Sequence, residues 1–310
     1  MDRKSWADRG QLLQVDGDGG RAGSARCVAV TRLGSAQCSS SPSTIWVQLR
    51  GRTWVESAEG RFQLRRGDWI VLDRESCPLV QSDRRGVTLG LAIGGGLAAA
   101  AARLTETGLF AGRGGVDRDE LRLFVRLWRG AERRLSDQVS LDGAGQLAAL
   151  RPLLLFIGAM QREMAVHIAR CPGRSHLRKR QVFSRLQRAR LYIEGNCDRV
   201  VRIAELARLT SFSTWYFSRA FQSLYEESPQ GASVRMRLER AALLLRTSGM
   251  LIGEIAAACG FDNCCSFARA FRSRFGTSAS HYRRTALSGS PTHSAKPGGS
   301  NGKAPIVSGT

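Results

Sequence analysis

The spacing of apolar residues changes character along the chain. From residue 26 to about residue 93, short apolar stretches alternate with turns, which is typical of β-strands. Between residues 118 and 169, and again between residues 181 and 284, apolar residues recur every three or four positions, which is typical of amphipathic helices. The pattern predicts an α+β protein of two domains, each long enough to bury its own core.

Turn-forming glycines punctuate the strand-rich half. Several strands at close spacing, with no long helix between them, predict a small antiparallel sandwich or β-barrel. Residues 1–24 are polar and glycine-rich, so we expect them to be loose. The expected strands cover residues 27–30, 44–49, 68–72 and 87–91, and the expected turns contain Gly51, Gly60, Gly67 and Gly86.

Two helices are expected after the strands, over residues 118–135 and 152–169, the second because Pro152 suits a first helical turn. A break at residues 171–175 then marks the domain boundary. Residues 286–310 contain almost no apolar residue, which predicts a disordered tail. The expected organisation is a loose segment 1–24, a β-barrel domain with trailing helices 25–170, a linker 171–181, an all-helical domain 182–285 and the tail.

A helix-turn-helix pattern occurs twice in the C-terminal half, at an offset of about 50 residues. Phe-x-Arg-Ala-Phe recurs at residues 217–221 and 267–271, each time after a short helical pattern and a turn. A repeat of a whole helical unit indicates architecture as well as chemistry. We expect seven helices between residues 181 and 284, the first with Val182, Leu186, Ala189 and Ile193 on one face.

The second helix of each unit is the expected recognition helix, with Ser213 and Asp262 as N-caps. Its phenylalanines face the core, and the positions beside them near the helix N-terminus are those that a recognition helix offers to base edges. Trp215 could instead pack beneath a loop, and the two arginines could contact phosphates. The expected DNA-contacting residues are Thr214, Trp215, Ser218 and Arg219, then Asn263, Cys264, Cys265, Ala268 and Arg269.

From Ile252 to Arg283 the sequence reads Ile-Gly-Glu-Ile-Ala-x-x-x-Gly-Phe-x-x-x-x-x-Phe-x-Arg-x-Phe-x-x-x-Phe-Gly-x-Ser-x-x-x-Tyr-Arg. This pattern resembles the signature of the AraC/XylS family of bacterial transcription regulators. The resemblance implies two recognition helices that enter successive major grooves on one face of the duplex. Two positions depart from the family pattern: Glu226 stands where glycine is usual and Ala279 where proline is usual. We expect altered stiffness there rather than lost binding.

On the same resemblance the base-reading residues are Trp215, Ser218 and Arg219 in the first unit, then Cys264, Cys265, Ala268 and Arg269 in the second. Two cysteines and an alanine are poor hydrogen-bond donors, so we expect the first unit to dominate specificity and the second to rely on Arg269, thymine methyl groups and phosphates. Cys264 and Cys265, with Cys259 nearby, could sense metal or redox state. Their spacing matches no zinc site, so we interpret them as small apolar fillers.

The strand-rich half resembles the cupin-like sensor of one AraC subgroup, through residues 46–55, 60–73 and Pro78. The four histidines (His167, His176, His281 and His293) lie outside the expected strands, so no metal site is expected. Without a metal site, the remaining roles for this barrel are effector binding and dimer formation. Trp46, Trp54 and Trp69 are candidate walls of an effector pocket, although an ordinary core explains them equally well.

Helices 118–135 and 152–169 stand where this family often places a dimer contact. Packing of both helices against the sheet is an equally good interpretation of their apolar stripes. These stripes consist of Leu121, Phe124, Val125, Trp128 and Leu135 in the first helix, and of Leu153, Ile157, Met160, Met164 and Ile168 in the second.

Charge and cysteine content fit this picture without deciding it. The net charge is +21, and all but four of the 47 basic residues are arginine. Such an excess suits a polyanionic partner through counterion release; the alternative interpretation, arginine codons favoured by a GC-rich genome, would account for about half of it. No apolar segment near Met1 indicates a secretory signal. We expect eight thiols in a cytoplasmic, nucleoid-associated protein that does not enter a membrane.

Together these patterns predict a sequence-specific DNA-binding transcription regulator, an activator, with no catalytic residue, cofactor or metal. The expected partners are double-stranded promoter DNA, RNA polymerase, a small-molecule effector and a second copy of the chain. One alternative is control by a partner protein or by concentration, with no small effector. Another is a DNA-repair enzyme with a zinc-bound, methyl-accepting cysteine, which needs four clustered cysteines where the N-terminal region has Cys27, Cys38 and Cys77.

Overall fold

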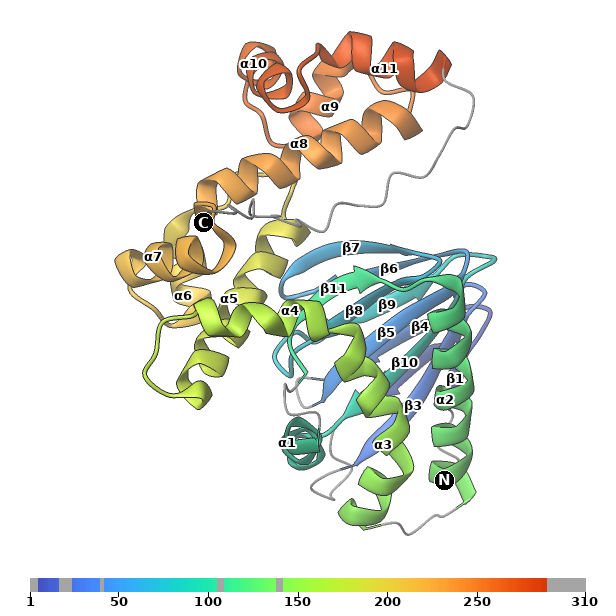
Figure 1. Ribbon diagram of the computed structural model, residues 1–310. Coiled ribbons are helices and arrows are strands. Elements are labelled where there is room, and N and C mark those ends of the chain that lie inside the picture. The colour runs from blue at the N-terminus through green and yellow to red at the C-terminus, as the bar shows by residue number, and fades with distance from the viewer. Residues whose placement is uncertain (1–4, 17–23, 40–41, 105–108, 138–141, 289–310) are drawn as a thin grey trace, which may run out of the picture. The chain divides into compact units, whose positions relative to one another are not determined.

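The computed structural model describes residues 5–16, 24–39, 42–104, 109–137 and 142–288 (Figure 1). The chain divides into two compact units, Met1–Arg237 and Leu238–Thr310. The strands and the first helix-turn-helix belong to the first unit, and the second helix-turn-helix belongs to the second. The division therefore falls inside helix α8 (Pro229–Thr247) and not in the segment 171–181, where we expected the domain boundary.

Two sheets build the strand-rich half, which agrees with the predicted sandwich or barrel. Neighbouring strands are antiparallel, except that β1 (Trp6–Ala7) pairs with β3 and β2 (Leu12–Val15) with β4 in parallel. The first sheet has the order β1, β3 (Ala25–Thr31), β10 (Val87–Ile93), β5 (Ser43–Arg50), β8 (Asp68–Leu72), β11 (Gly112–Gly115). The second has the order β2, β4 (Ser35–Cys38), β9 (Leu79–Ser82), β6 (Arg52–Ser57), β7 (Gly60–Arg65).

Alternation of side chains along the strands produces two cores. On β5, Ile45 and Val47 point to one face of the sheet and Trp46 points to the other. The first face packs against helices, and the second packs against the five-stranded sheet. Two of the expected turn glycines, Gly51 (φ +68°) and Gly67 (φ +87°), have the left-handed backbone that glycine adopts without strain.

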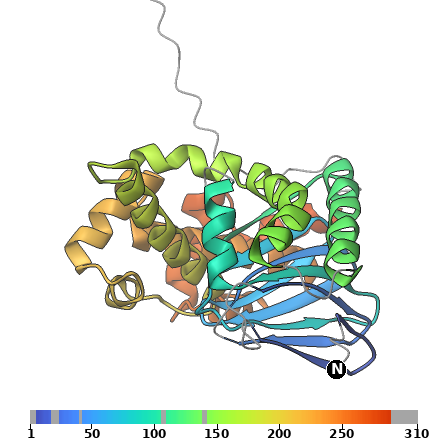
Figure 2. The same cartoon turned by 90° about the horizontal axis from the view of Figure 1, so that it is seen from below.

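Three helices cover one face of the six-stranded sheet: α1 (Gly95–Leu104), α2 (Arg118–Asp137) and α3 (Gly143–Met160) (Figures 1 and 2). Trp128 of α2 donates a hydrogen bond from Nε1 to Gly90 O on β10 (2.8 Å), which ties this helix to the middle of the sheet. By length and composition α3 could also span a membrane. Its Leu150, Leu153, Leu154 and Ile157 are nevertheless buried against the sheet, as in the core helix of a folded domain.

Two expectations about element boundaries were wrong. The segment 1–24 is not all loose, because β1 and β2 lie within its described residues; strands of two and four residues are too short to show a clear alternation. The helix expected from residue 152 begins nine residues earlier, at Gly143, because Asp142 caps it by accepting a hydrogen bond from Gly145 N (2.7 Å). Pro152 thus lies inside the helix. Residues 1–4 and 17–23 lie outside the described residues.

The chain continues from α3 through α4 (Arg162–Val166) and the short 3-10 helix η1 (His167–Arg170). Helix α5 (His176–Gly195) then begins inside the expected linker 171–181, with Ser175 as N-cap. The seven helices expected in the C-terminal half are present. They are α5, α6 (Ile203–Thr210), α7 (Thr214–Tyr225), α8, α9 (Ile252–Ala258), α10 (Cys264–Phe275) and α11 (Ala279–Ser288).

The linker helix α8 contributes to two separate clusters. Its Ala232 and Met236 pack with α5, α6 and α7, whereas Ala241 and Leu245 pack with α9 and α10. The last helix, α11, takes in residues 286–288 of the expected tail, and residues 289–310 lie outside the described part of the chain.

Candidate nucleic-acid interface

The turn of the first helix-turn-helix is built from residues 211–213. Ser211 has a left-handed backbone (φ 54°) and ends α6. Ser213 Oγ accepts a hydrogen bond from Tyr216 N (3.2 Å) and thereby begins α7. The N-cap that the sequence predicted at Ser213 is confirmed.

Helix α7 buries one stripe and exposes the other. Phe217 and Phe221 are at most 1% exposed, whereas Trp215 is 66% exposed, so Trp215 does not pack beneath a loop. The guanidinium carbon of Arg219 lies 4.9 Å from the centroid of the Trp215 ring. This is a cation–π contact between residues one helical turn apart. Ser218 donates its hydroxyl hydrogen to Thr214 O (2.9 Å), which leaves its lone pairs free to accept.

The second recognition helix is capped one residue later than the sequence predicted. Asn263 Oδ1, not Asp262, accepts the hydrogen bond from Ser266 N (2.7 Å). The reason is a longer turn: Phe212 and Phe261 are 49 positions apart, but Phe217 and Phe267 are 50 apart. Because the turn gains one residue, the position that corresponds to Ser213 in the fold is Asn263.

Helix α10 exposes the residues that we assigned to DNA contact. Cys264, Cys265, Ala268 and Arg269 are exposed, and the stripe around Phe267 is buried. The two cysteines are therefore not buried fillers, in contrast to Cys259, which is fully buried. The carboxamide oxygen of Asn263 is occupied by its capping role. Cys264 is exposed as the first residue of α10, and Cys265 lies on the side of the helix away from Phe267.

The three tryptophans proposed as pocket walls do not come together. Trp46 is 1% exposed and lies between the two sheets, whereas Trp69 lies in the core that faces the helices. Trp46 pairs with Ile70 and Val47 with Trp69 across neighbouring strands, so the two indoles point to opposite faces. Trp54 is 45% exposed. The sequence could not separate them, because only the strand register sets the face of each residue.

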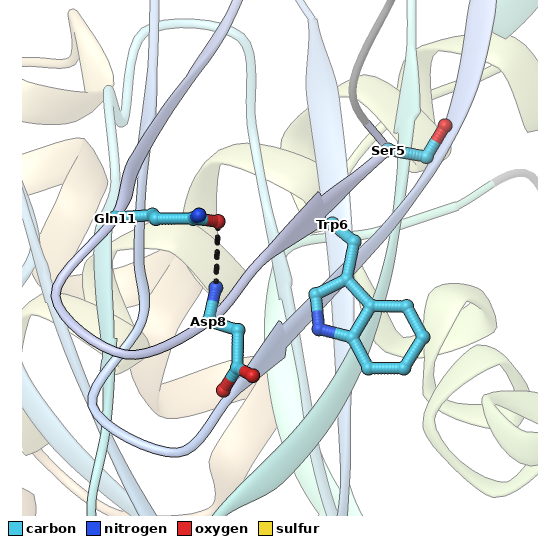
Figure 3. A pocket seen from close by; sticks show the side chains of 4 residues that line it. All are labelled: Ser5, Trp6, Asp8 and Gln11. Atoms are coloured by element: carbon cyan, nitrogen blue, oxygen red, sulfur yellow. Dashed lines mark hydrogen bonds between the residues drawn. The ribbon is translucent and has the colours of Figure 1, made fainter.

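Two open hollows lie on the surface of the described barrel. One open hollow of about 360 Å³ is lined by Ser5, Trp6, Asp8 and Gln11, with Asp8 N donating to Gln11 Oε1 (Figure 3). Another, of about 350 Å³, lies beside Gly67 and Arg118. Neither is lined by Trp46, Trp54 or Trp69. Their shapes give no support for an enclosed effector site at either place.

Comparison with known proteins identifies the repeat. A family profile described as a helix-turn-helix domain matches residues 206–285. The chain is 34% identical over 97 residues to the transposon Tn10 TetD protein of Escherichia coli, covering 31% of this chain and 70% of that protein. The chain belongs to the AraC/XylS family of transcription regulators. AraC-family membership makes it a DNA-binding regulator.

Other AraC-family relatives match in the same way. The HTH-type transcriptional regulator CdhR of Pseudomonas aeruginosa is 28% identical over 223 residues, 65% of this chain and 64% of that protein. The C-terminal domain of AraT, a response regulator from Geobacillus stearothermophilus, is 31% identical, covering 33% of this chain and 84% of that one, with a TM-score of 0.32. The chain thus spans less than two thirds of CdhR.

No pattern in the sequence indicated the polar groups that hold the first helix-turn-helix, α6 and α7, in place. Arg185 of α5 donates a hydrogen bond from Nη1 to Thr210 O (3.1 Å). Its guanidinium carbon also lies 5.3 Å from the centroid of the Phe212 ring, so Arg185 contacts the turn before α7 at two points. At the start of α6, a hydrogen bond from Arg199 (2.8 Å) holds the pKa of Glu205 below its usual range. An arginine in an arginine-rich helix gives no signal of such a role.

Proposed function

We propose that α7 supplies most of the sequence specificity of this AraC-family regulator. The observation that carries this proposal is the exposed stack of Trp215 and Arg219 near the N-terminus of α7. A guanidinium can donate two hydrogen bonds to one guanine, and the indole beside it restricts its rotamers. The matching surface of α10 has one arginine, Arg269, beside two thiols and a methyl group.

Substitution of Arg219 by alanine tests base reading. We expect R219A to lose roughly 1–3 kcal/mol at one base pair while binding to unrelated duplexes is mostly kept. R61A is the matched control, because it removes the same charge from an exposed position on the barrel. Binding should also fall steeply with salt, with a log–log slope of about −0.9 per phosphate contacted. Equal loss of affinity on all sequences would make Arg219 a backbone anchor.

We further propose that a small effector acts on the space between the two sheets. Trp46 Nε1 and Thr44 Oγ1 lie there, both buried, and neither has a hydrogen-bond partner among the described residues. Unpaired buried donors are costly, so a polar ligand group that pairs with them would gain affinity. A thermal-shift screen of metabolites against the wild type and W46F tests this, with W54F as the exposed control. A shift that W46F retains would contradict the site.

A rival proposal is control by a partner protein or by concentration. This proposal would be favoured if no metabolite shifts the melting temperature and one partner protein binds saturably to the full chain in a pull-down. The enzyme alternative needs clustered cysteines, whereas Cys27 packs in the core facing the helices, Cys38 packs between the sheets, and Cys77 is exposed. A zinc assay of purified protein tests that alternative directly.

We also propose that the protein activates transcription in the cytoplasm by contacting RNA polymerase on promoter DNA, as a dimer through α2 and α3. Leu123 and Leu155 are 36% and 45% exposed on these helices, which supports a contact there. Light scattering on the wild type and L155E measures the dimer. A reporter gene with the selected DNA site upstream of a promoter distinguishes activation from repression.

A further inference from the structure

Helix α5 packs on both of its long sides. Val182, Leu186 and Ile193 join the core of α6 and α7, as the sequence pattern predicted. Leu191 lies on the opposite side of the helix and is 2% exposed in the core between the two sheets of the barrel. The helix that supports the first reading head is therefore also part of the barrel.

A buried ion pair lies on the barrel side of α5. Arg188 Nε donates to Glu59 Oε1 at 2.8 Å, and the two side chains are 16% and 1% exposed. Glu59 occupies the turn between β6 and β7. Arg188 Nη1 also donates to Glu75, which is exposed. A buried carboxylate that loses its cation is strongly unfavourable, so Glu59 holds Arg188 firmly.

The C-terminal end of α5 also contacts the backbone of the same turn. Asn196 Nδ2 donates to Glu59 O (2.9 Å). A Cβ atom on Gly195 would lie 2.4 Å from Glu59 O, and one on Gly60 would lie 2.4 Å from Gly195 O. Only glycines allow this approach, so the turn and the helix end fit together in one way.

The other side of α5 contacts the turn that precedes α7. Arg185, three positions before Arg188, donates to Thr210 O and stacks on Phe212. Arg190 lies 5.0 Å from the ring centroid of Tyr225, at the end of α7. A displacement of α5 on the barrel would therefore move the turn and both ends of the reading helix.

We propose that Glu59 and Arg188 are positioning residues for DNA binding by the first helix-turn-helix. The pair fixes α5 on the barrel, and α5 fixes the direction in which α7 is presented. Side chains that read bases must be held to within about 0.5 Å, so a loosened α5 should weaken specific binding more than phosphate binding. This inference rests on the proposed role of α7.

The test uses the full chain with E59Q, R188M, R188K and the double variant E59Q/R188M. The matched controls are E56Q and R61M, which break an exposed ion pair (3.1 Å) on the same β6–β7 hairpin. Three quantities are measured: affinity for a site selected in vitro, affinity for a scrambled duplex, and hydrogen exchange of the amides in residues 203–225.

We expect E59Q and R188M to weaken specific binding at least about tenfold, with scrambled-duplex affinity within about twofold of wild type. Exchange in residues 203–225 should rise. R188K should restore part of the affinity. The double variant should recover thermal stability relative to R188M, because the buried Glu59 carboxylate is no longer left without its cation, yet it should remain weak in specific binding. The controls should match the wild type.

Restoration of specific affinity in the double variant would overturn the proposal, because the pair would then act on stability alone. Specific affinity at the wild-type level in folded single variants would overturn it as well. If the single variants do not fold, the double variant and R188K decide by the same criteria. Failure of the α7 assignment is recognised separately, because R219A would then leave specific binding unchanged while exchange in the pair variants still rises.

Discussion

The two helix-turn-helix units have the same interior. The ring centroids of Phe217 and Phe221 are 5.6 Å apart, and those of Phe267 and Phe271 are 5.5 Å apart. The next ring along each recognition helix is tilted against its neighbour, with the ring centroids 4.5 Å apart in both units. These ring spacings differ by at most 0.1 Å between the two copies, across a sequence offset of about 50 residues.

What differs is the outer surface and the attachment. Helix α7 presents an indole and a guanidinium, whereas α10 presents two thiols, a methyl group and one guanidinium. The first helix-turn-helix is attached to the barrel through α5, whereas the second belongs to the other compact unit, Leu238–Thr310. Packing constrains the interior of each copy, whereas its exposed face and its anchoring are free to diverge.

The largest effect is expected in the cores. Phe221 and Phe271 are both at most 1% exposed, so F221A and F271A should each cost roughly 3–5 kcal/mol. F271A should lower the urea concentration at which the second helix-turn-helix unfolds and leave that of the first unchanged. F221A should have the opposite effect. Urea unfolding followed by hydrogen exchange in residues 203–225 and 252–275 measures both. Equal loss of protection in both segments for either variant would show that the two copies unfold together.

Only the barrel-attached unit should depend on pH near 6. Burial raises the pKa of Asp73 to about 6; Arg188 opposes this, and Glu59 and Glu75 add to it. Because the folded pKa lies above the unfolded value of 3.8, Asp73 costs nothing below about pH 4; its destabilising effect grows as pH rises from about 4 to about 6 and is complete above that. The side chain keeps some exposure, so the loss is at most about 3 kcal/mol.

D73N removes this ionisation and should be more stable than the wild type at pH 8, with the difference shrinking towards pH 4. Urea unfolding of the first unit between pH 4 and pH 8 gives the comparison. D262N, at an exposed position in the second turn, should follow the wild-type curve throughout. A D73N curve parallel to the wild type would mean that Asp73 ionises as freely in the fold as in the unfolded chain.

The sequence predicted those features that a regular period carries. The stripe of phenylalanines identified both recognition helices, and the glycine-marked turns identified the two-sheet barrel. Asp262 was misassigned as a cap because a one-residue insertion in a turn leaves no periodic trace. The first strands were missed because their pairing with β3 and β4 depends on partners elsewhere in the chain.

The candidate site was only partly accessible from the sequence. Exposure of Trp215 and Arg219 followed from their place beside the buried stripe, but their stacking required coordinates. The barrel side of α5 was missed for a physical reason: a helix buried on both sides has no single apolar stripe. Glu59 and Arg188 are 129 positions apart, and charged residues give no pairing signal at that separation.

DNA should protect the thiols of α10. Cys264 and Cys265 are exposed at the start of this helix, and Cys77 is exposed on the barrel. If the start of α10 faces the groove, duplex at ten times its Kd should slow alkylation of Cys264 and Cys265 by roughly tenfold. Cys77 is the internal control and should react at its original rate. Mass spectrometry of peptides after a timed N-ethylmaleimide pulse gives all three rates, and unprotected α10 thiols would mean that the first unit binds DNA alone.

The smallest effect is expected where the two recognition helices end. Both C-caps are left-handed, but the residue is Glu226 (φ 57°) in the first unit and Gly276 (φ 70°) in the second. No atom lies within 4 Å of a Cβ built on Gly276, so G276A should cost only the backbone strain, about 1 kcal/mol. E226G should relieve that strain, yet it also removes an exposed ion pair with Arg170 (3.1 Å), worth about 0–1 kcal/mol.

We therefore expect E226G to stabilise the first unit by roughly 0.5 kcal/mol in urea unfolding, with R170M as the variant that removes the ion pair alone. A stabilised E226G would mean that glutamate at this cap is tolerated rather than selected for stability. Destabilisation by both E226G and R170M would give the opposite answer. The ion pair would then outweigh the strain, and η1, which follows the barrel domain, would be a second element that holds the C-terminal end of α7.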